Sequence, residues 1–171
     1  MNIEIAIVGL GKMGLGINNR LSKKGIKVYG YDSGWNEDLY KKNNINGANN
    51  LKDLIGLFNS SRKIIWVMVP SGKATDDTIT ELNTLLNEGD VIIDGGNSNY
   101  KESIKKYNLL KSNKISFLDS GTSGGVWGEE DGYCLMVGGD KDVYKICEPI
   151  FKALSAEGKG CLLYTSDAAD E

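Results

Sequence analysis

The amino-acid sequence predicts an α/β domain with a doubly wound, mainly parallel β-sheet. Short apolar runs alternate along the chain with amphipathic segments of helical spacing, and the loops between them are short. Parallel strands need crossovers of this kind, because the chain must return to the edge of the sheet from which it started. The 171 residues suffice for one such domain with a sizeable core.

The expected strands and helices extend to about residue 160, so residues 1–160 are expected to form most of this domain, which is incomplete at its C-terminal edge. Strands are expected over residues 3–8, 27–31, 63–69, 91–94, 115–119 and 133–137. Helices are expected over residues 12–24, 37–42, 51–59, 75–87, 100–111 and 141–154. Residues 121–132 are rich in glycine and are expected to form a loop.

The composition excludes several classes of protein. Hydrophobic residues make up 40% and charged residues 25%, as in soluble globular proteins. The net charge of -3 offers no basic surface to nucleic acid, and no apolar run is long enough to span a membrane. The chain has no histidine, and Cys134, Cys147 and Cys161 lack the spacing of metal ligands. We therefore expect reduced thiols, no metal site and, without a signal-peptide pattern, a cytoplasmic protein.

A glycine-rich turn lies between the first expected strand and the first expected helix. Its sequence, Gly9-Leu10-Gly11-Lys12-Met13-Gly14, has the G-x-G-x-x-G spacing in the strand–turn–helix context that gives this motif its meaning. Gly9 permits the tight turn, Gly11 lets the backbone approach a pyrophosphate, and Gly14 lets the helix pack closely on the sheet. Free N–H groups at the helix N-terminus stabilise the phosphates. The sequence thus predicts a Rossmann dinucleotide-binding site.

Asp32 follows the second expected strand, about 20 residues after the glycine turn. A carboxylate there accepts hydrogen bonds from the adenine ribose, and its charge repels the 2′-phosphate of NADP. Ser33 and Gly34 supply no cation to offset that charge, so the pattern favours NAD over NADP, with FAD less favoured still. An aspartate that only stabilises the turn before Gly34 is the alternative.

Three further polar or glycine-rich segments follow strands, at residues 68–72, 93–98 and 119–125. They bring small side chains and exposed N–H groups to the carboxyl edge of the sheet, where doubly wound proteins bind their ligands. Such groups suit a polar, anionic substrate held against a nicotinamide. The alternative is a set of structural turns.

The most specific motifs are Gly-Leu-Gly-Lys-Met-Gly at 9–14, Asp-Gly-Gly-Asn-Ser at 94–98 and Ser-Gly-Gly at 123–125. With them the chain resembles the decarboxylating 6-phosphogluconate dehydrogenases from residue 1 to about residue 158. The wider β-hydroxyacid dehydrogenases, such as the 3-hydroxyisobutyrate and tartronate semialdehyde types, share the first and last motifs. They usually lack the second, so this motif favours the 6-phosphogluconate enzymes.

The resemblance implies which residues bind the cofactor NAD. In chain order these are Gly9, Leu10, Gly11, Lys12, Met13, Gly14, Asp32, Val69, Pro70, Ser71 and Asn97. Many members have Lys where Pro70 stands. Asp32 stands where NADP-dependent members have Asn-Arg followed by Ser or Thr, so the chain resembles the NAD-preferring branch.

The resemblance also implies the substrate, 6-phosphogluconate, and its binding residues Asn97, Ser123, Gly124 and Gly125. In the family, C3 of the sugar acid is oxidised, CO2 is lost, and the enediol is reprotonated, with a Lys as general base and a Glu as general acid. Both residues, and the all-helical domain that forms a homodimer, follow residue 160 in the family. Neither catalytic residue is therefore assigned in this chain, which by itself is expected to be an inactive cofactor fragment.

Residues 161–171 are expected to have a separate origin. One reading frame of a transposon-end adapter used in DNA sequencing libraries encodes all of them, so we predict a non-native tail. A genuine acidic tail is the alternative.

Two other functions fit parts of the pattern. A related β-hydroxyacid dehydrogenase would act on a short 3-hydroxy acid, and an NAD-sensing module would perform no chemistry. The sensing module would have no need of Asn97 or of Ser123-Gly124-Gly125 at the crevice.

Overall fold

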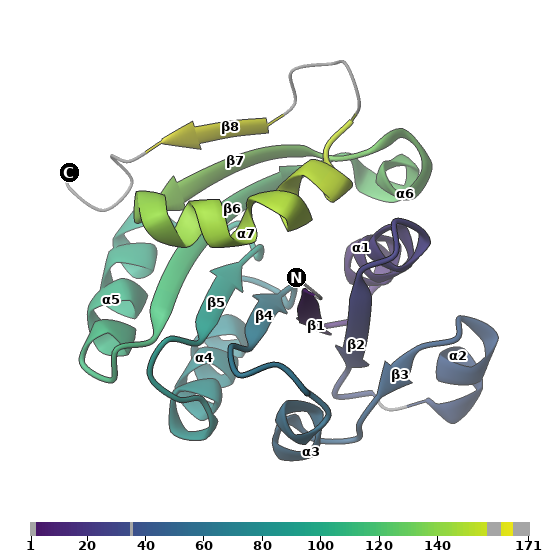
Figure 1. Ribbon diagram of the computed structural model, residues 1–171, viewed down its shortest axis with the longest axis horizontal. Helices are drawn as coiled ribbons and strands as arrows, with labels where there is room; N and C mark the ends of the chain where they lie inside the picture. Colours follow the sequence, from purple (N-terminus) through teal and green to yellow (C-terminus); the bar gives the residue numbers. More distant parts are fainter. Residues whose placement is uncertain (1–2, 35, 157–161, 166–171) are drawn as a thin grey trace.

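A twisted eight-stranded sheet with helices on both faces forms the protein (Figure 1). The computed structural model describes residues 3–34, 36–156 and 162–165. The strands are β1 (Glu4–Val8), β2 (Lys27–Tyr31), β3 (Asn46–Gly47), β4 (Ile64–Val67), β5 (Val91–Asp94), β6 (Ser116–Ser123), β7 (Cys134–Gly139) and β8 (Leu162–Thr165). The helices are α1 (Lys12–Lys23), α2 (Glu37–Lys42), α3 (Leu51–Gly56), α4 (Lys73–Leu85), α5 (Tyr100–Lys111), the 3₁₀ turn η1 (Gly125–Trp127), α6 (Gly128–Asp131) and α7 (Lys141–Leu154).

The strand order is β3-β2-β1-β4-β5-β6-β7-β8. Its first six strands have the doubly wound Rossmann order, and every neighbouring pair is parallel except β6 and β7. The predicted fold class is therefore confirmed. The direction of winding reverses between β1 and β4, so the carboxyl ends of these two strands border the crevice where such folds bind ligands.

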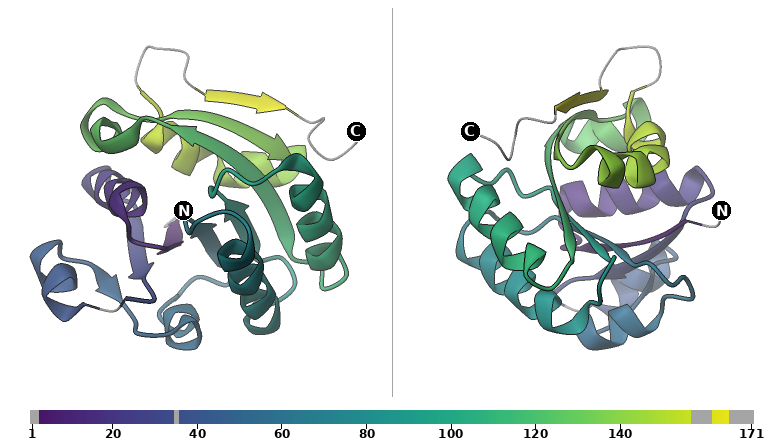
Figure 2. Two further views of the ribbon diagram at one scale, coloured as in Figure 1. Left: turned by 180° about the vertical axis from the view of Figure 1, so that it is seen from behind. Right: turned by 60° about the vertical axis from the view of Figure 1, so that its left-hand side comes forward.

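The sheet separates two hydrophobic cores, because alternate residues of a strand point to opposite faces. Ile5 and Ile7 of β1 belong to the core beneath α1 and α7, whereas Ala6 and Val8 belong to the core beneath α3, α4 and α5. Figure 2 shows the sheet between these two layers. Strands covered on both faces are apolar without alternation, which is why β4, with the sequence IIWV, is buried throughout.

Most expected elements agree with the structure to within a few residues, but the glycine-rich segment does not. Residues 121–132 were expected to form a loop, and this prediction is wrong for much of the segment. β6 continues to Ser123, where it is paired with Cys134 at the start of the antiparallel strand β7, and η1 and α6 follow directly. Pairing with β7 supplies the backbone hydrogen bonds that the local sequence does not signal. The two-residue strand β3 was also not expected.

Residues 162–165 form β8 at the edge of the sheet, parallel to β7. The other residues of the proposed adapter tail, and the domain boundary at residue 160, lie outside the described residues. The adapter origin of residues 161–171 stays a prediction.

The structure also bears on the cysteines and on membrane insertion. Cys147 is a free thiol on α7, and burial raises its pKa to about 12. Cys134 is disulfide-bonded, so the expectation of reduced thiols is wrong for this residue. Within the described ranges, the helices are too short or too polar to cross a membrane.

Arg20 connects α1 to the C-terminal ends of two other helices. Its buried guanidinium donates hydrogen bonds of 3.0–3.2 Å to the carbonyl oxygens of Glu129 and Glu130 at α6, and of Ala153 and Ser155 at α7. Carbonyls at a helix C-terminus have no partner within the helix and carry partial negative charge. One cation thus caps both helices and fixes them against α1.

We predict that Arg20→Met lowers the free energy of unfolding by roughly 3 kcal/mol, because four partly buried carbonyls lose their donor. Urea denaturation followed by circular dichroism measures this change. Arg62→Met is the matched control. Arg62 is exposed and donates a hydrogen bond of 2.9 Å to the carbonyl of Gly89, so its loss should cost less than about 1 kcal/mol. Equal losses in the two variants would contradict the prediction.

Candidate functional site

A cleft of about 930 Å³ lies at the carboxyl ends of β1, β2, β4, β5 and β6, with one side formed by α4. It brings together most of the residues predicted from sequence. These are Gly9, Gly11, Lys12, Met13, Gly14, Asp32, Val69, Pro70, Asn97, Ser123, Gly124 and Gly125. The predicted cofactor and substrate residues therefore share one cavity.

The glycine turn forms the floor of the cleft. A Cβ on Gly14 would lie 1.8 Å from the carbonyl oxygen of Gly9, so only glycine allows α1 to begin this close to β1. A Cβ on Gly11 would meet nothing within 4 Å. Gly11 precedes the first residue of α1 and lines the cleft, so the space beside it and the free N–H groups of the helix fit a pyrophosphate.

Two predicted residues do not line the cleft. The side chain of Leu10 is buried in the core beneath α1, and only its backbone N–H faces the site, donating to Asp32. Ser71 is exposed in the loop after β4 and is absent from the cleft lining.

Asp32 is held rigidly at the end of β2. Its Oδ2 accepts a hydrogen bond of 2.8 Å from the backbone N–H of Leu10, and its Oδ1 accepts one of 2.8 Å from that of Gly34. Asp32 therefore stabilises the turn, as the alternative reading of the sequence proposed, and it also lines the cleft. Each carboxylate oxygen has a further lone pair available to a hydroxyl group.

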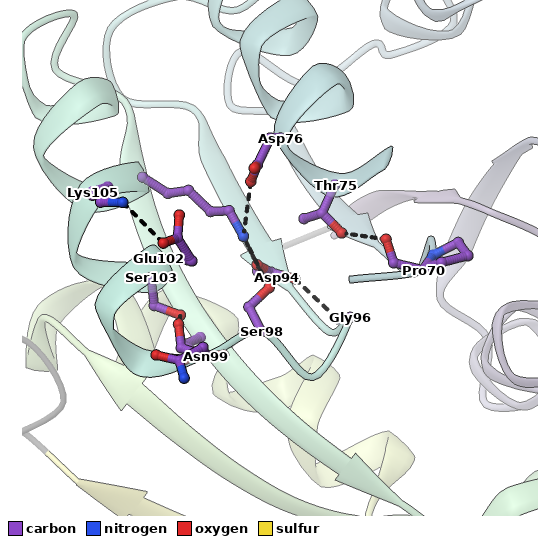
Figure 3. Close-up of polar contacts among 12 residues, drawn as sticks. Pro70, Thr75, Asp76, Asp94, Gly96, Ser98, Asn99, Glu102, Ser103 and Lys105 are labelled. Carbon is purple, nitrogen blue, oxygen red and sulfur yellow. Dashed lines mark hydrogen bonds and ion pairs between the residues drawn. The ribbon is translucent and has the colours of Figure 1, made fainter. Parts of the chain in front are cut away.

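Asp94 organises the loop that carries Asn97 (Figure 3). Its buried carboxylate accepts hydrogen bonds from the N–H of Gly96 at 2.9 Å, the hydroxyl of Ser98 at 2.8 Å and the ammonium of Lys106 at 3.0 Å. Asn97, between the first two partners, has φ 58° and lines the cleft. The carboxylate thus holds Asn97 in a conformation that few residues adopt unaided.

Lys106 extends this network from α5 to α4. Its buried ammonium also lies 3.5 Å from Asp76 Oδ1, near the start of α4. Thr75, the neighbour of Asp76, donates a hydrogen bond of 2.9 Å to the carbonyl oxygen of Pro70. Figure 3 shows Asp76 and Thr75 on α4, close to Asp94 and Pro70. The loop after β4 is therefore bonded to α4, and Lys106 connects the end of β5 to both α5 and α4.

Tyr133 supports the third loop of the cleft from below. Its ring would lie 2.9 Å from a Cβ on Gly124 and 2.1 Å from one on Gly128, so the loop can pack on it only where side chains are absent. Burial raises the pKa of Tyr133 to about 12. This phenol stays neutral and acts as a rigid support for Ser123, Gly124 and Gly125.

Sequence reasoning missed the side of the cleft that α4 forms. Ala74, Asp77, Thr78 and Glu81 line it from successive turns of that helix. Their spacing of three and four residues marks one helical face, but a polar face of this kind also suits solvent. Met68, Gly95, Gly96 and Thr122 also line the cleft, and all lie within the segments singled out from the sequence.

Comparison with known proteins decides the family. The family described as the NAD binding domain of 6-phosphogluconate dehydrogenase matches residues 4–165. The chain belongs to this family. The predicted resemblance is thereby confirmed, and the chain is an NAD(P)-binding domain.

Relatives of known name are similar over nearly the whole chain. The YqeC protein of Bacillus subtilis (strain 168) is 42% identical, over 97% of this chain and 55% of its own length. The NAD(+)-dependent, decarboxylating 6-phosphogluconate dehydrogenase of the same organism is 38% identical, over 90% of this chain and 34% of its own length. The chain thus spans about half of the first relative and a third of the second.

Solved structures give the same result. The 6-phosphogluconate dehydrogenase of Plasmodium falciparum, described with its cofactor NADP+, has a TM-score of 0.86 at 27% identity, over 97% of this chain and 38% of that one. The 3-hydroxyisobutyrate dehydrogenase of Mycobacterium tuberculosis has a TM-score of 0.82 at 21% identity, over 96% of this chain and 54% of that one. The second likeness concerns the fold alone.

We predict that Gly11→Ala folds normally but binds NAD roughly tenfold or more weakly. The φ of Gly11, −63°, is open to alanine, and the new methyl group fills space that the pyrophosphate needs. Gly56→Ala is the control, since that site on α3 is equally open and is absent from the cleft lining. Titration calorimetry measures the affinities. Wild-type affinity in Gly11→Ala would show that this backbone does not contact the cofactor.

We predict that Lys106→Met lowers the free energy of unfolding by about 3 to 5 kcal/mol, because it leaves the carboxylate of Asp94 buried without its cation. Lys105→Met, one residue earlier on α5, removes an exposed lysine paired with Glu102 and should change the stability far less. Urea denaturation of both variants checks the difference. A small loss in Lys106→Met would mean that Asp94 does not depend on this ion pair.

Proposed function

We propose that the chain is the cofactor domain of an NAD-preferring 6-phosphogluconate dehydrogenase. The whole enzyme would convert 6-phosphogluconate and NAD to ribulose 5-phosphate, CO2 and NADH. The observation that carries this proposal is the shared cleft. In it, Asn97 and Ser123-Gly124-Gly125 face the same cavity as the glycine turn and Asp32. An NAD-sensing module would not need Asn97 or Ser123-Gly124-Gly125 in this cavity.

Each group in the cleft has a part in this reaction. Gly11 and the N-terminus of α1 would hold the pyrophosphate, and Asp32 would accept hydrogen bonds from the ribose hydroxyls. Asn97 would orient both the nicotinamide and the sugar acid, and the exposed loop at Ser123-Gly124-Gly125 would bind the substrate by its N–H groups and the Ser123 hydroxyl.

The order of steps follows from the substrate. NAD, when bound, would supply the acceptor for the hydride of C3, while a base would take the proton of the C3 hydroxyl. The resulting carbonyl lies β to the carboxylate and accepts the electron pair that CO2 leaves behind, and the enediol is then reprotonated. The Lys and Glu that move these protons are proposed to lie in the part of the enzyme that follows this chain. That part is also proposed to form the homodimer of a cytoplasmic enzyme.

The preference for NAD is proposed from Asp32. Its negative charge would lie beside the 2′ position of the adenine ribose, where NADP carries a phosphate and NAD a hydroxyl. The NAD(+)-dependent relative from Bacillus subtilis supports this choice, whereas the relative from Plasmodium falciparum is described with NADP+.

We predict that this chain binds NAD more tightly than NADP, measured by titration calorimetry.

We also predict that the product of the complete gene forms NADH and CO2 from 6-phosphogluconate, measured by absorbance and by trapping of CO2. The chain alone should show negligible turnover, because it lacks the proposed acid and base. Turnover of 3-hydroxyisobutyrate without that of 6-phosphogluconate would instead identify a related β-hydroxyacid dehydrogenase.

A further inference from the structure

The end of the cleft where Asp32 would bind the adenine ribose lies between the end of β2 and one face of α4. Tyr31, Asp32 and Ser33 line it from β2. Opposite them, the residues of α4 that line the cleft recur every three or four positions, from Ala74 to Glu81. The sequence places the determinant of cofactor specificity, Asp32, on the β2 side, so the α4 side has no assigned role yet.

The two acidic residues on this face of α4, Asp77 and Glu81, differ in whether a nearby cation neutralises their charge. Asp77 is paired with Lys73 at 2.5 Å, one turn earlier on the helix. Glu81 is exposed, and no ion pair to it occurs among the described residues. Lys12, the cation of the glycine turn, lies at the start of α1 on the pyrophosphate side. Glu81 therefore brings an uncompensated negative charge to the cleft.

The charge of Glu81 acts at the same place as that of Asp32. After burial, these two carboxylates are the next causes that raise the pKa of the Tyr31 phenol. Tyr31 directly precedes Asp32 in the chain and also lines the cleft. Two carboxylates on different elements thus act on one phenol, at the end of the cleft where Asp32 would bind the ribose.

We propose that Glu81 is a second determinant of cofactor specificity, which disfavours NADP by repelling the 2′-phosphate that would bind beside Asp32. This inference rests on the proposed binding of NAD in the cleft. A 2′-phosphate carries up to two negative charges, whereas the 2′-hydroxyl of NAD carries none. Glu81 therefore acts on one cofactor and leaves the other nearly unaffected, and it needs no direct contact to do so.

The test compares wild type with Glu81→Gln, using titration calorimetry with NAD and with NADP at about 0.02 M ionic strength. The affinity for NADP should rise about three- to tenfold in Glu81→Gln, and the affinity for NAD should change less than about twofold. Glu88→Gln is the matched control. It changes the net charge equally and lies just beyond α4, but Glu88 is paired with Lys114 and is absent from the cleft lining.

Ionic strength supplies a second measurement, which needs no variant. At about 0.5 M salt the repulsion is screened, so the preference of the wild type for NAD should become smaller, and Glu81→Gln should differ less from wild type. A structural effect of residue 81 would not depend on salt in this way.

The outcomes separate the inference from the proposed function. If the wild type binds neither cofactor, the proposed function fails as well. If the wild type binds NAD but Glu81→Gln leaves the NADP-to-NAD ratio unchanged, the inference alone is overturned. Equal weakening of both cofactors, or an equal gain in Glu88→Gln, also overturns it, because neither is a local effect on the 2′-phosphate.

Discussion

The buried carboxylate of Asp94 constrains the site more than any other group, because a charge without water needs a full set of partners. The partners of Asp94 come from its own loop and from α5. Lys106 also reaches Asp76 on α4, so one ammonium joins β5 to α4 and α5, two of the helices on this face of the sheet. The loop that presents Asn97 is consequently held in place by groups of the protein itself.

Much of the fold follows from local patterns in the sequence. Strands covered on both faces must be apolar throughout, and the crossovers between them must be amphipathic, so the order of elements was predictable. The end of β6 was not predictable. Residues 119–123 contain small and polar side chains with little preference for strands, and they are extended because β7 lies antiparallel beside them. A partner strand that follows a turn and a short helix leaves no local signal.

The residues of the candidate site likewise fall into those that a local sequence pattern predicts and those that only tertiary packing reveals. The glycine turn, Asp32 and the loops at Asn97 and Ser123 were found because each has a fixed spacing within one segment. The contributions of α4 and Lys106 were missed. Glu81 and Lys106 read as ordinary solvent-facing residues of amphipathic helices, and only the packing of α4 and α5 beside the loops gives them neighbours. Sequence spacing identifies cleft residues that belong to one motif more readily than residues that only tertiary packing brings beside them.

Arg20 sets limits on how the domain can move. α1 begins at the pyrophosphate site, and α6 follows directly after the Ser123-Gly124-Gly125 loop. Four hydrogen bonds from one guanidinium join α1 to the ends of α6 and α7, so any hinge between these helices would break several bonds at once. The helices that follow the glycine turn and the Ser123-Gly124-Gly125 loop are therefore held at a fixed spacing. Because Asp32 also bonds the end of β2 to the glycine turn, a hinge that narrows the cleft would have to lie outside all of these segments.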